Sequence, residues 1–367
     1  MLVSLLLALQ AVSLDDPSWN YAPAAASRVT DHLGRRALVI GSGRAARPDI
    51  RFVDGTIEFD MAVTGGRAFA YLQLRMASDT AYEEVYFRPH KNGLPDAVQY
   101  APVHQGISAW QFHHGPGGTA PAEFERGGWT HVRVVVSGPS LAVFVGDVPT
   151  PQLVVPRMAR APAEGYIALR NFLPAGVDPA RHATGFTNLV VKPGVVSWVF
   201  PKAAAEAPAA PGTILRWEVT PAFAPDSGPV RSLPDSVMRR AAWRRVSAGA
   251  RGLVSLAEHL AIPDGMRRWA TLARLRLASP GEITVRLALG FSDEVTVFLN
   301  GRPIMSGDQR YSFDNPRQEG VIGFHQATVY LPLRAGANEL ILAISDGFGG
   351  WGVMGRLEDA AGVRVSP

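Results

Sequence analysis

The sequence predicts an all-β protein made of two antiparallel β-sandwich (jelly-roll) domains joined by a Pro/Ala-rich linker. Three observations predict this fold. Many short segments alternate apolar and polar residues, which is the period of a strand with one buried face. Glycine, proline and asparagine separate these segments, as they do in turns. One stretch, 201–212 (PKAAAEAPAAPG), has linker composition, so the predicted domains are 14–200 and 213–367.

The strand pattern of the first domain is clearest in three segments. They are TIEFDMAV at 56–63, YLQLRM at 71–76 and HVRVVV at 131–136. Every second residue in each segment is apolar and is expected to face the core. The segments SLAVFV and GYIALRNF follow with similar composition. Antiparallel strands of this length predict a sandwich rather than a parallel sheet.

The second domain repeats this style. EITVRLAL at 282–289 alternates throughout, and DEVTVFLNGRPI at 293–304 alternates up to Asn300-Gly301, a strong signal for a type I′ hairpin turn. ATVYLPLRAGANELILAISDG at 327–347 is a strand, a turn and a strand. Helix signals are few, and the best short helix is expected over 235–246 (DSVMRRAAWRRV).

Composition excludes several functions. The chain has no cysteine, which excludes disulfides, cysteine-ligated zinc and a cysteine nucleophile. Its net charge is +4, and the basic residues do not gather into a run with interleaved aromatic residues. We therefore expect no nucleic-acid partner. No segment is long and apolar enough to predict a transmembrane helix.

The N-terminus predicts export. Residues 2–9 form a short apolar run, and Ala11-Val12-Ser13 places small residues where a signal peptidase cuts. A signal peptide over residues 1–13 makes the protein secreted or periplasmic, and thus extracytoplasmic. The alternative is that this run is a buried first strand or helix.

Period-2 geometry collects polar side chains opposite the core positions of the first domain. If these strands are neighbours, carboxylates, guanidiniums, amides and aromatic rings lie together, as sugar recognition requires. The segment after Tyr82 would then run as a strand into a loop, with a further strand beginning at Trp110. The alternative is an ordinary polar outer face, with Trp110 in the core. The candidate ligand-binding residues are Glu58, Asp60, Tyr71, Gln73, Arg75, Glu84, Tyr86, Arg88, His90, Gln99, Trp110, Gln111 and His113.

The order of these segments is similar to that of a known family. FVDGTIEFDMAV, FAYLQLRMASDTAYEEVYFRP, WTHVRVVVSGPSLAVFVGD and GYIALRNF with ATGFTNLVV cover nearly all of residues 35–192. They resemble the concanavalin A-like lectin/glucanase fold, including laminin-G-like domains. They also resemble the exported bacterial domains grouped as 3-keto-disaccharide hydrolases. The resemblance implies a sandwich, but this fold serves lectins, enzymes and adhesion modules alike.

The second domain also has a resemblance. WATLARLRLASPGEITVRLALGFSDEVTVFLNGRPI and VYLPLRAGANELILAISDGFGGWGVMGRL resemble galactose-binding-like jelly rolls, which accompany many glycoside hydrolases. The glycine-rich end DGFGGWG could expose Trp351 to a sugar. The favoured interpretation is that Trp351 closes the sandwich core and the glycines permit a tight bend.

Catalytic residues stay unknown at this stage. Retaining glucanases of the resembled fold carry Glu-x-Asp-x-x-Glu on one strand, and here Val63 stands where the third acid belongs after Glu58 and Asp60. Glu83 or Glu84 could supply a carboxyl from a neighbouring strand, but no pattern marks either one. A glycoside or 3-keto-disaccharide hydrolase activity is left open by the resemblance.

No resident metal or cofactor is expected, although calcium is left open. Adjacent His113 and His114 would point to opposite faces of a strand, which makes them a poor zinc pair. Oxygen ligands suit calcium, and loop carboxylates at Asp54, Asp79 and Asp96 are the candidates.

The sequence thus predicts an exported bacterial carbohydrate-recognition protein that binds a carbohydrate or glycoconjugate, with glycoside-hydrolase-type activity in the first domain left open. The alternative is a non-catalytic adhesion or structural module that binds a protein partner. A large apolar patch without a polar groove would favour that alternative.

Overall fold

The computed structural model describes residues 10–23, 26–179, 181–202, 205–225, 228–240, 242–263, 266, 268–312, 315 and 318–367. These residues are built almost wholly of antiparallel strands, so the predicted all-β sandwich class is confirmed. Two short α-helices occur among them, α1 (Asp235–Arg239) and α2 (Leu256–His259). Neither these nor any other helix in the described ranges has the length and apolarity needed to cross a bilayer.

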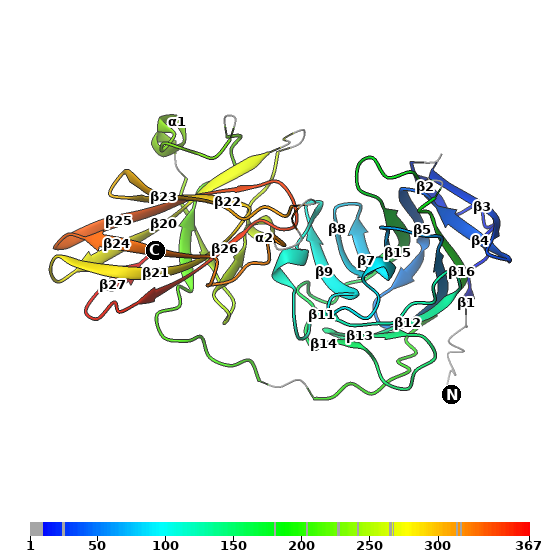
Figure 1. The fold of residues 1–367 in the computed structure, drawn as a ribbon. Coiled ribbons are helices and arrows are strands. Elements are labelled where there is room, and N and C mark those ends of the chain that lie inside the picture. The colour runs from blue at the N-terminus through cyan, green and yellow to red at the C-terminus, as the bar shows by residue number, and fades with distance from the viewer. Residues whose placement is uncertain are drawn as a thin grey trace. The chain divides into compact units, whose positions relative to one another are not determined.

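The chain divides into two compact units (Figure 1). The N-terminal unit comprises the described parts of Met1–Gly106 and His113–Ala203. The C-terminal unit comprises Ile107–Phe112 together with the described parts of Ala204–Pro367. A short segment from the first half of the sequence therefore belongs to the second unit.

The N-terminal unit contains two sheets. Sheet A runs in the order β14 (Leu153–Val155), β13 (Ser140–Val145), β12 (Thr130–Ser137), β6 (Gly55–Val63), β16 (Thr184–Pro193), β4 (Arg35–Ile40) and β3 (Ser27–His32), and β1 (Gln10–Ala11) also pairs with β16. Sheet B contains β9 (Val98–His104), β8 (Ala81–Phe87), β7 (Phe69–Ser78), β15 (Gly165–Phe172), β5 (Gly43–Phe52) and β2 (Asn20–Ala22), and β11 (Thr119–Ala120) pairs with β9.

The core of this unit lies between the two sheets. The ring of Phe59 on β6 meets Phe87 of sheet B at 6.0 Å and Phe186 of sheet A at 5.9 Å between centroids. These three rings are fully buried. The apolar positions of the alternating segments therefore form the core, and the polar positions face outward from each sheet.

The start of the described chain belongs to this core. Residues 1–9 of the predicted signal peptide lie outside the described residues. Gln10 and Ala11 pair with Val191 and Val190 on β16. Val12 is buried, and its N–H donates to the carbonyl of Leu189 at 2.8 Å. Cleavage after Ser13 would remove this strand and a core side chain.

The C-terminal unit also contains two sheets. The larger, sheet D, runs β18 (Arg244–Ser247), β17 (Arg216–Val219), β20 (Trp269–Ser279), β25 (Gly336–Asp346), β22 (Glu294–Leu299) and β23 (Arg302–Asp308), and β27 (Arg364–Ser366) also pairs with β20. Sheet C runs β19 (Leu253–Ser255), β26 (Gly352–Glu358), β21 (Ile283–Ser292) and β24 (Ala327–Leu333). Trp217 and Trp351 are fully buried in the core of the unit, as expected for Trp351.

Two local expectations for this unit have different outcomes. The Asn300-Gly301 hairpin is present, with φ of 50° and 80° joining β22 to β23. The helix expected over 235–246 is wrong beyond Arg239, because Arg244 to Ser247 form strand β18. Val246 pairs with Trp217 and is buried in the core, which the helix would not allow.

The segment from Ile107 to Phe112 completes the C-terminal unit. It contains β10 (Ile107–Ser108) and a 3₁₀ helix at Trp110–Phe112, so the strand expected to begin at Trp110 is wrong. Ile107 joins the main core of this unit, and Phe112 packs with Ile322 and Met354. A Cβ on Gly352 would lie only 2.6 Å from the Phe112 ring, so a glycine is required for this contact.

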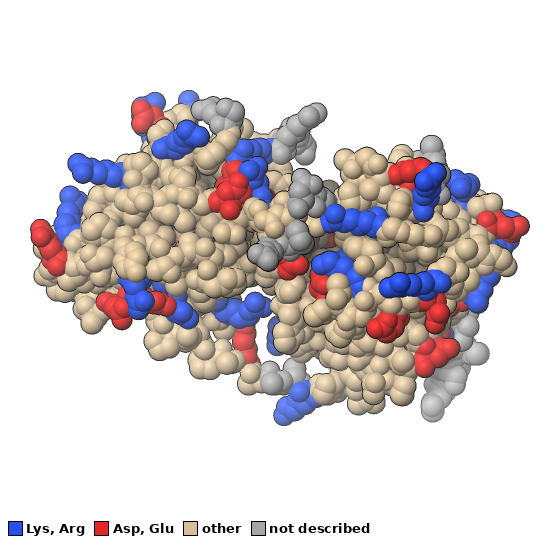
Figure 2. Space-filling view, viewed as in Figure 1, with Lys and Arg blue, Asp and Glu red and all other residues tan. Residues whose placement is uncertain are grey.

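Surface charge shows no single dominant sign. Figure 2 shows Lys and Arg interspersed with Asp and Glu over the coloured part of the visible face, with wide uncharged areas between them. Many charged side chains of the described residues are paired, and the buried Arg47, for example, lies 2.9 Å from Asp16 and 2.7 Å from Asp49.

Candidate functional site

The strands of sheet B bring several of the candidate residues together. Gln73 on β7 is the cross-strand partner of Glu84 on β8, and Tyr71 is the partner of Tyr86. Tyr86 is in turn opposite Gln99 on β9. Residues that are directly opposite in a ladder share a face of the sheet. We call this surface the polar face, and it consists of Tyr71, Gln73, Glu84, Tyr86, Arg88, Gln99 and Arg170.

A hydrogen-bond network connects the side chains of this face. The amide of Gln73 donates to Glu84 Oε2 at 3.2 Å. The Tyr86 hydroxyl and the Arg88 guanidinium both donate to Gln99 Oε1, at 2.5 and 2.9 Å. The Tyr71 and Tyr86 rings stack with centroids 5.2 Å apart. This network fixes each side chain in one orientation, which preorganises the face.

Burial keeps the two stacked tyrosines of the polar face neutral. Burial raises the pKa of both Tyr71 and Tyr86 well above 10. Burial on its own would also raise the pKa of Asp96, but the adjacent Arg88 and Lys91 outweigh it and hold that pKa below its usual value. Asp96 therefore stays ionised beside Arg88, whose Nη1 lies 3.1 Å away.

The edge of the polar face carries three half-buried rings, which we call the rim platform: Phe69, His90 and Phe172. Phe69 contacts His90 edge-on at 4.9 Å and Phe172 at 5.8 Å between ring centroids. The Arg170 guanidinium lies over Phe172 at 5.6 Å and over Tyr71 at 4.9 Å, so it links the platform to the polar face.

His90 is a neutral member of this platform. It follows β8 on the 3₁₀ helix Pro89–Lys91, and its Nδ1 lies 3.0 Å from the carbonyl of Ala68. Burial, followed by the charges of Arg88 and Arg67, lowers the pKa of His90 to about 4. At neutral pH its imidazole therefore presents an uncharged ring.

The polar face and the rim platform differ in how far they are exposed to solvent. Gln73, Glu84 and Gln99 are fully buried, whereas the Arg170 side chain is 29% exposed. Phe69 and Phe172 are likewise half-buried. A ligand can therefore reach Arg170 and the rim platform first, and the buried residues hold these groups in position.

Glu58 and Asp60 lie elsewhere. Both are on β6 of sheet A, where they alternate with the core residues Ile57 and Phe59. Glu58 pairs with Lys192 at 2.9 Å, while Asp60 contacts Arg35, His131 and Asn188 at 2.8, 2.8 and 2.7 Å. The structure thus separates these two carboxylates from the polar face.

Arg75 also leaves the polar face, because β7 carries a bulge. Its φ is 50°, and the pairing of β7 with β8 shifts register between Leu74 and Ser78. The shift places Met76 in a cluster with Tyr82, whereas Arg75 turns away to pair with Asp54 at 2.8 Å. An extra residue of this kind reverses the alternation beyond it.

The last three candidates are also apart from the polar face. Trp110 and Gln111 belong to the C-terminal unit, where Gln111 Oε1 accepts from the Ser292 hydroxyl at 2.5 Å. His113 is in the N-terminal unit, but its ring packs edge-on against the core residue Tyr100. Its carbonyl accepts a hydrogen bond from Gln99 Nε2 at 2.7 Å.

Sequence reasoning missed Arg170, Phe69 and Phe172. The alternation of GYIALRNF contained the signal for two of them, since Arg170 and Phe172 are two residues apart and share a face. Their proximity to Tyr71 could not be predicted, because β15 inserts beside β7 from about one hundred residues further along the chain.

Glu83 points to the other side of β8. Its Oε2 accepts from the Tyr100 hydroxyl at 2.7 Å and its Oε1 from the backbone N–H of Arg160 at 3.0 Å. Burial raises the pKa of Glu83 to about 7, and the hydrogen bonds partly oppose this rise. It fastens the loop at Ala159 and Arg160 to the core and is not part of the polar face.

The three candidate calcium ligands are each engaged by an arginine. Asp54 pairs with Arg75, Asp79 with Arg44 and Asp96 with Arg88. Within the described ranges, no group of three or more histidine or acidic side chains converges in the manner of a metal site.

Comparisons with known proteins give only distant resemblances. No protein-family model and no curated protein matches the sequence. Among solved structures, the carbohydrate-binding module CBM66 from Bacillus subtilis is 14% identical, with a TM-score of 0.32, over 47% of this chain and 93% of that one. The β-glucanase of Bacillus licheniformis is 13% identical, with a TM-score of 0.34, over 46% and 83%.

A third solved structure, a Bacillus subtilis protein with a galectin-like fold, is 8% identical, with a TM-score of 0.35, over 50% of this chain and 98% of that one. Because all three TM-scores are low, the assignment of fold class rests on the strands and their pairing, and the functional argument rests on the geometry of the polar face.

Proposed function

We propose that the N-terminal unit binds a carbohydrate or glycoconjugate at the rim platform and the adjoining polar face. The observation that carries the proposal is the position of Arg170. Its partly exposed guanidinium lies beside Phe172 and above Tyr71, within 3.9 Å of Glu84 Oε2. Aromatic faces accept the C–H surface of a sugar ring, and guanidinium donors bind its oxygens.

The hydrogen-bond network supports this proposal. A sugar is recognised by donors and acceptors whose positions are fixed before binding. Gln73, Glu84 and Gln99 have no solvent exposure and hold one another or Arg88 in place. A partly exposed edge with a rigid polar interior favours binding over a merely solvated outer face.

Binding without hydrolysis is the function that we favour. Hydrolysis of a glycosidic bond generally needs two carboxyl groups flanking it. The direct partners of Glu84 are Gln73 on β7 and Ala101 on β9, which supply no second carboxyl. Asp96, which pairs with Arg88, also pairs with Lys91, so its charge is committed to cations.

We also propose that the protein works outside the cytoplasm. The apolar run at residues 2–9 supports export of the chain. The pairing of Gln10 and Ala11 with β16 supports removal of a leader ahead of Gln10 rather than after Ser13.

The test is a glycan array probed with the purified chain 10–367, with and without a calcium chelator. We expect selective binding to one sugar class, and we expect Arg170→Gln and Phe172→Ala to weaken it by about tenfold or more, as loss of a charge-assisted bond or a stacking ring does. Arg35→Gln, on sheet A, is the matched control. A blank array, or binding unchanged by both variants, would refute the proposal.

Hydrolysis is assayed on the same glycans by following release of reducing ends. The proposal predicts binding with no release. Release that is lost in Glu84→Gln would show that the polar face is catalytic instead.

A further inference from the structure

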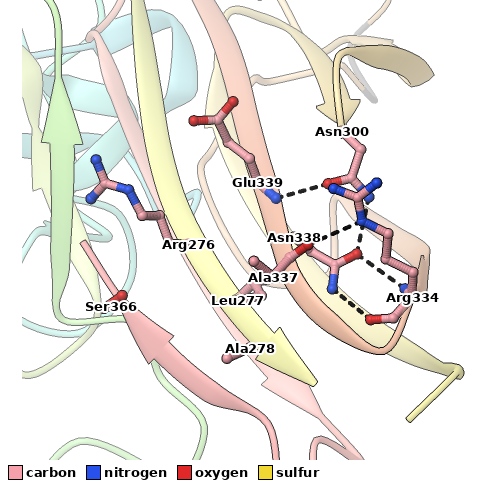
Figure 3. Close-up of a pocket in the computed structure, with 9 residues that line it drawn as sticks. All are labelled: Arg276, Leu277, Ala278, Asn300, Arg334, Ala337, Asn338, Glu339 and Ser366. Atoms are coloured by element: carbon pink, nitrogen blue, oxygen red, sulfur yellow. Dashed lines mark hydrogen bonds between the residues drawn. The ribbon is translucent and has the colours of Figure 1, made fainter. Parts of the chain in front are cut away.

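The C-terminal unit has a small depression of about 230 Å³ on its larger sheet (Figure 3). Its floor contains Ala278 on β20 and Ala337 on β25, which are direct cross-strand partners. Their neighbours Leu277 and Asn338 are buried, so the alanines point to the outer face of the sheet. Because the side chains at these two adjacent positions are small, a hollow remains above them.

Polar groups from three strands form one side of this hollow. Arg276 on β20 is opposite Glu339 on β25, and it is also opposite Ser366 on β27. These three residues therefore form a row across the sheet. They present a guanidinium, a carboxylate and a hydroxyl beside the alanine floor.

The other side is built by two hairpin turns. Asn300 lies in the β22–β23 turn and Arg334 in the β24–β25 turn. The buried Asn338 ties them together, because its Oδ1 accepts from Asn300 Nδ2 and from the Arg334 backbone N–H, each at 3.0 Å. The turn that carries Arg334 is thus rigidly positioned (Figure 3).

Of the three charged side chains that line the hollow, Arg276 and Glu339 have ion-pair partners among the described residues and Arg334 has none. Glu218 pairs with Arg274 at 2.7 Å and Arg276 at 3.1 Å, and Glu339 pairs with Arg274 at 3.5 Å. Two arginines and two glutamates are thereby matched. Arg334 Nε donates to the carbonyl of Ala337 at 3.1 Å, and Arg334 forms no ion pair with any residue in the described ranges.

We propose that this hollow binds the carboxylate-bearing ring of an acidic sugar, a hexuronate. Arg334, held through Nε, has its two terminal nitrogens available for a carboxylate, which is the fork geometry that guanidinium provides. The ring lies over Ala278 and Ala337, and its hydroxyls bond to Glu339 and Ser366. At 230 Å³ the hollow is below the roughly 300 Å³ at which sites for drug-sized ligands begin, so it takes a single ring.

This site lies in a different unit from the rim platform and does not depend on the function proposed for it. An inorganic anion would satisfy Arg334 but leave the alanine floor and the Glu339–Ser366 row unused. A neutral hexose would use the floor and the row but leave Arg334 unmatched. The proposal therefore requires both the ring and the carboxylate.

The test is isothermal titration of the chain 10–367, which contains both units, with glucuronate, glucose and acetate. We expect saturable binding of glucuronate at least about tenfold tighter than that of glucose or acetate, and weaker as salt is added. Arg334→Gln should remove the preference for glucuronate. Ala337→Leu, which fills the floor without changing charge, should weaken glucuronate binding while keeping any acetate binding.

Arg302→Gln is the matched control, because it removes an exposed arginine from the neighbouring strand without touching the hollow. Equal loss in Arg302→Gln and Arg334→Gln would mean nonspecific attraction and would overturn the proposal. Equal affinity for glucose and glucuronate, or no binding of glucuronate by the chain 10–367, would also overturn it. Thermal melting of each variant confirms that the fold is retained.

Discussion

The carboxylate Oδ2 of Asp293 lies 2.8 Å from the backbone nitrogen of Phe348. The same oxygen accepts the N–H of Gly347 at 2.9 Å. One residue before β22 therefore holds the glycine-rich loop that follows β25. Asp346, the last residue of β25, is also buried, so two carboxyl groups lie close to this loop.

Because of Asp293 and Asp346, we expect the free energy of unfolding of the C-terminal unit to depend on pH. Burial, followed by the charge of Asp293, raises the pKa of Asp346 well above its usual value, and burial raises the pKa of Asp293 to about 6 from 3.8. A raised folded-state pKa means that the folded chain binds the proton more tightly. The stabilisation from Asp293 is therefore fully present below about pH 3.8 and is lost as pH rises through about 6, and the stabilisation from Asp346 is also lost as pH rises.

Asp346→Asn should abolish the share of Asp346. We expect the variant to have a higher melting temperature than the parent at pH 8, by roughly 2–4 °C for each kcal/mol of free energy gained. At pH 4 the two melting temperatures should be close. Asp308→Asn is the opposite control, since the hydrogen bond from Arg310 lowers the pKa of Asp308. Scanning calorimetry at both pH values checks the sign, and a lower melting temperature for Asp346→Asn at pH 8 contradicts it.

Tyr100→Phe should destabilise the N-terminal unit. The Tyr100 hydroxyl donates to Glu83 and accepts from the N–H of Ala159 at 2.6 Å, so its loss leaves two buried groups without this partner. We expect a loss of about 1–3 kcal/mol in the free energy of unfolding. Urea denaturation measures it, with Tyr330→Phe on the exposed Tyr330 as control. Equal losses in both variants would show that the hydroxyl network contributes nothing.

Removal of the first strand should also destabilise the N-terminal unit. A chain that begins at Leu14 lacks β1 and the buried Val12 side chain. We expect it to lose about 1.5–3 kcal/mol or more relative to a chain that begins at Gln10, because one core side chain and a ladder are removed. Urea midpoints of the two chains provide the comparison. Identical midpoints would mean that β1 is dispensable and that cleavage after Ser13 is structurally harmless.

Phe112→Ala should destabilise the C-terminal unit, although Phe112 is encoded within the first half of the chain. Its ring packs on Ile322 and Met354 and is 2% exposed. We expect a cost of about 3–5 kcal/mol, as for other buried phenylalanines. Hydrogen exchange of β21 and β26 localises the effect. Faster exchange in β7 and β8 instead would place the ring's contribution in the other unit.

The sequence predicts those features of the fold and the site that depend on neighbouring residues, and it does not predict those that depend on distant segments. The alternation of 71–76 placed Tyr71 and Gln73 on one face, because side chains in a regular strand alternate without exception. It misplaced Arg75, since a bulge with φ of 50° has no reliable mark in one sequence. Glu58 and Asp60 were also grouped wrongly, because alternation says which face of a strand is polar but not which of two sheets the strand joins.

Pairing between distant segments was the other limit. Arg170 reaches Tyr71 only because β15 pairs with β7, and Gln111 reaches Ser292 across 181 positions of sequence. The fold class was predicted correctly without knowledge of these pairings, because it follows from the strand period and the turn residues throughout the chain.

The placement of Ile107–Phe112 has a consequence for biosynthesis. On the ribosome, these residues emerge roughly ninety positions before the start of the sequence that will bury them. Ile107 and Phe112 are therefore synthesised before the C-terminal residues that bury them, and apolar side chains exposed in this way favour aggregation and chaperone binding. Neither unit corresponds to one uninterrupted stretch of the gene. A recombination event that replaced residues 204–367 with another module would therefore leave the apolar side chains of Ile107 and Phe112 without the core that buries them.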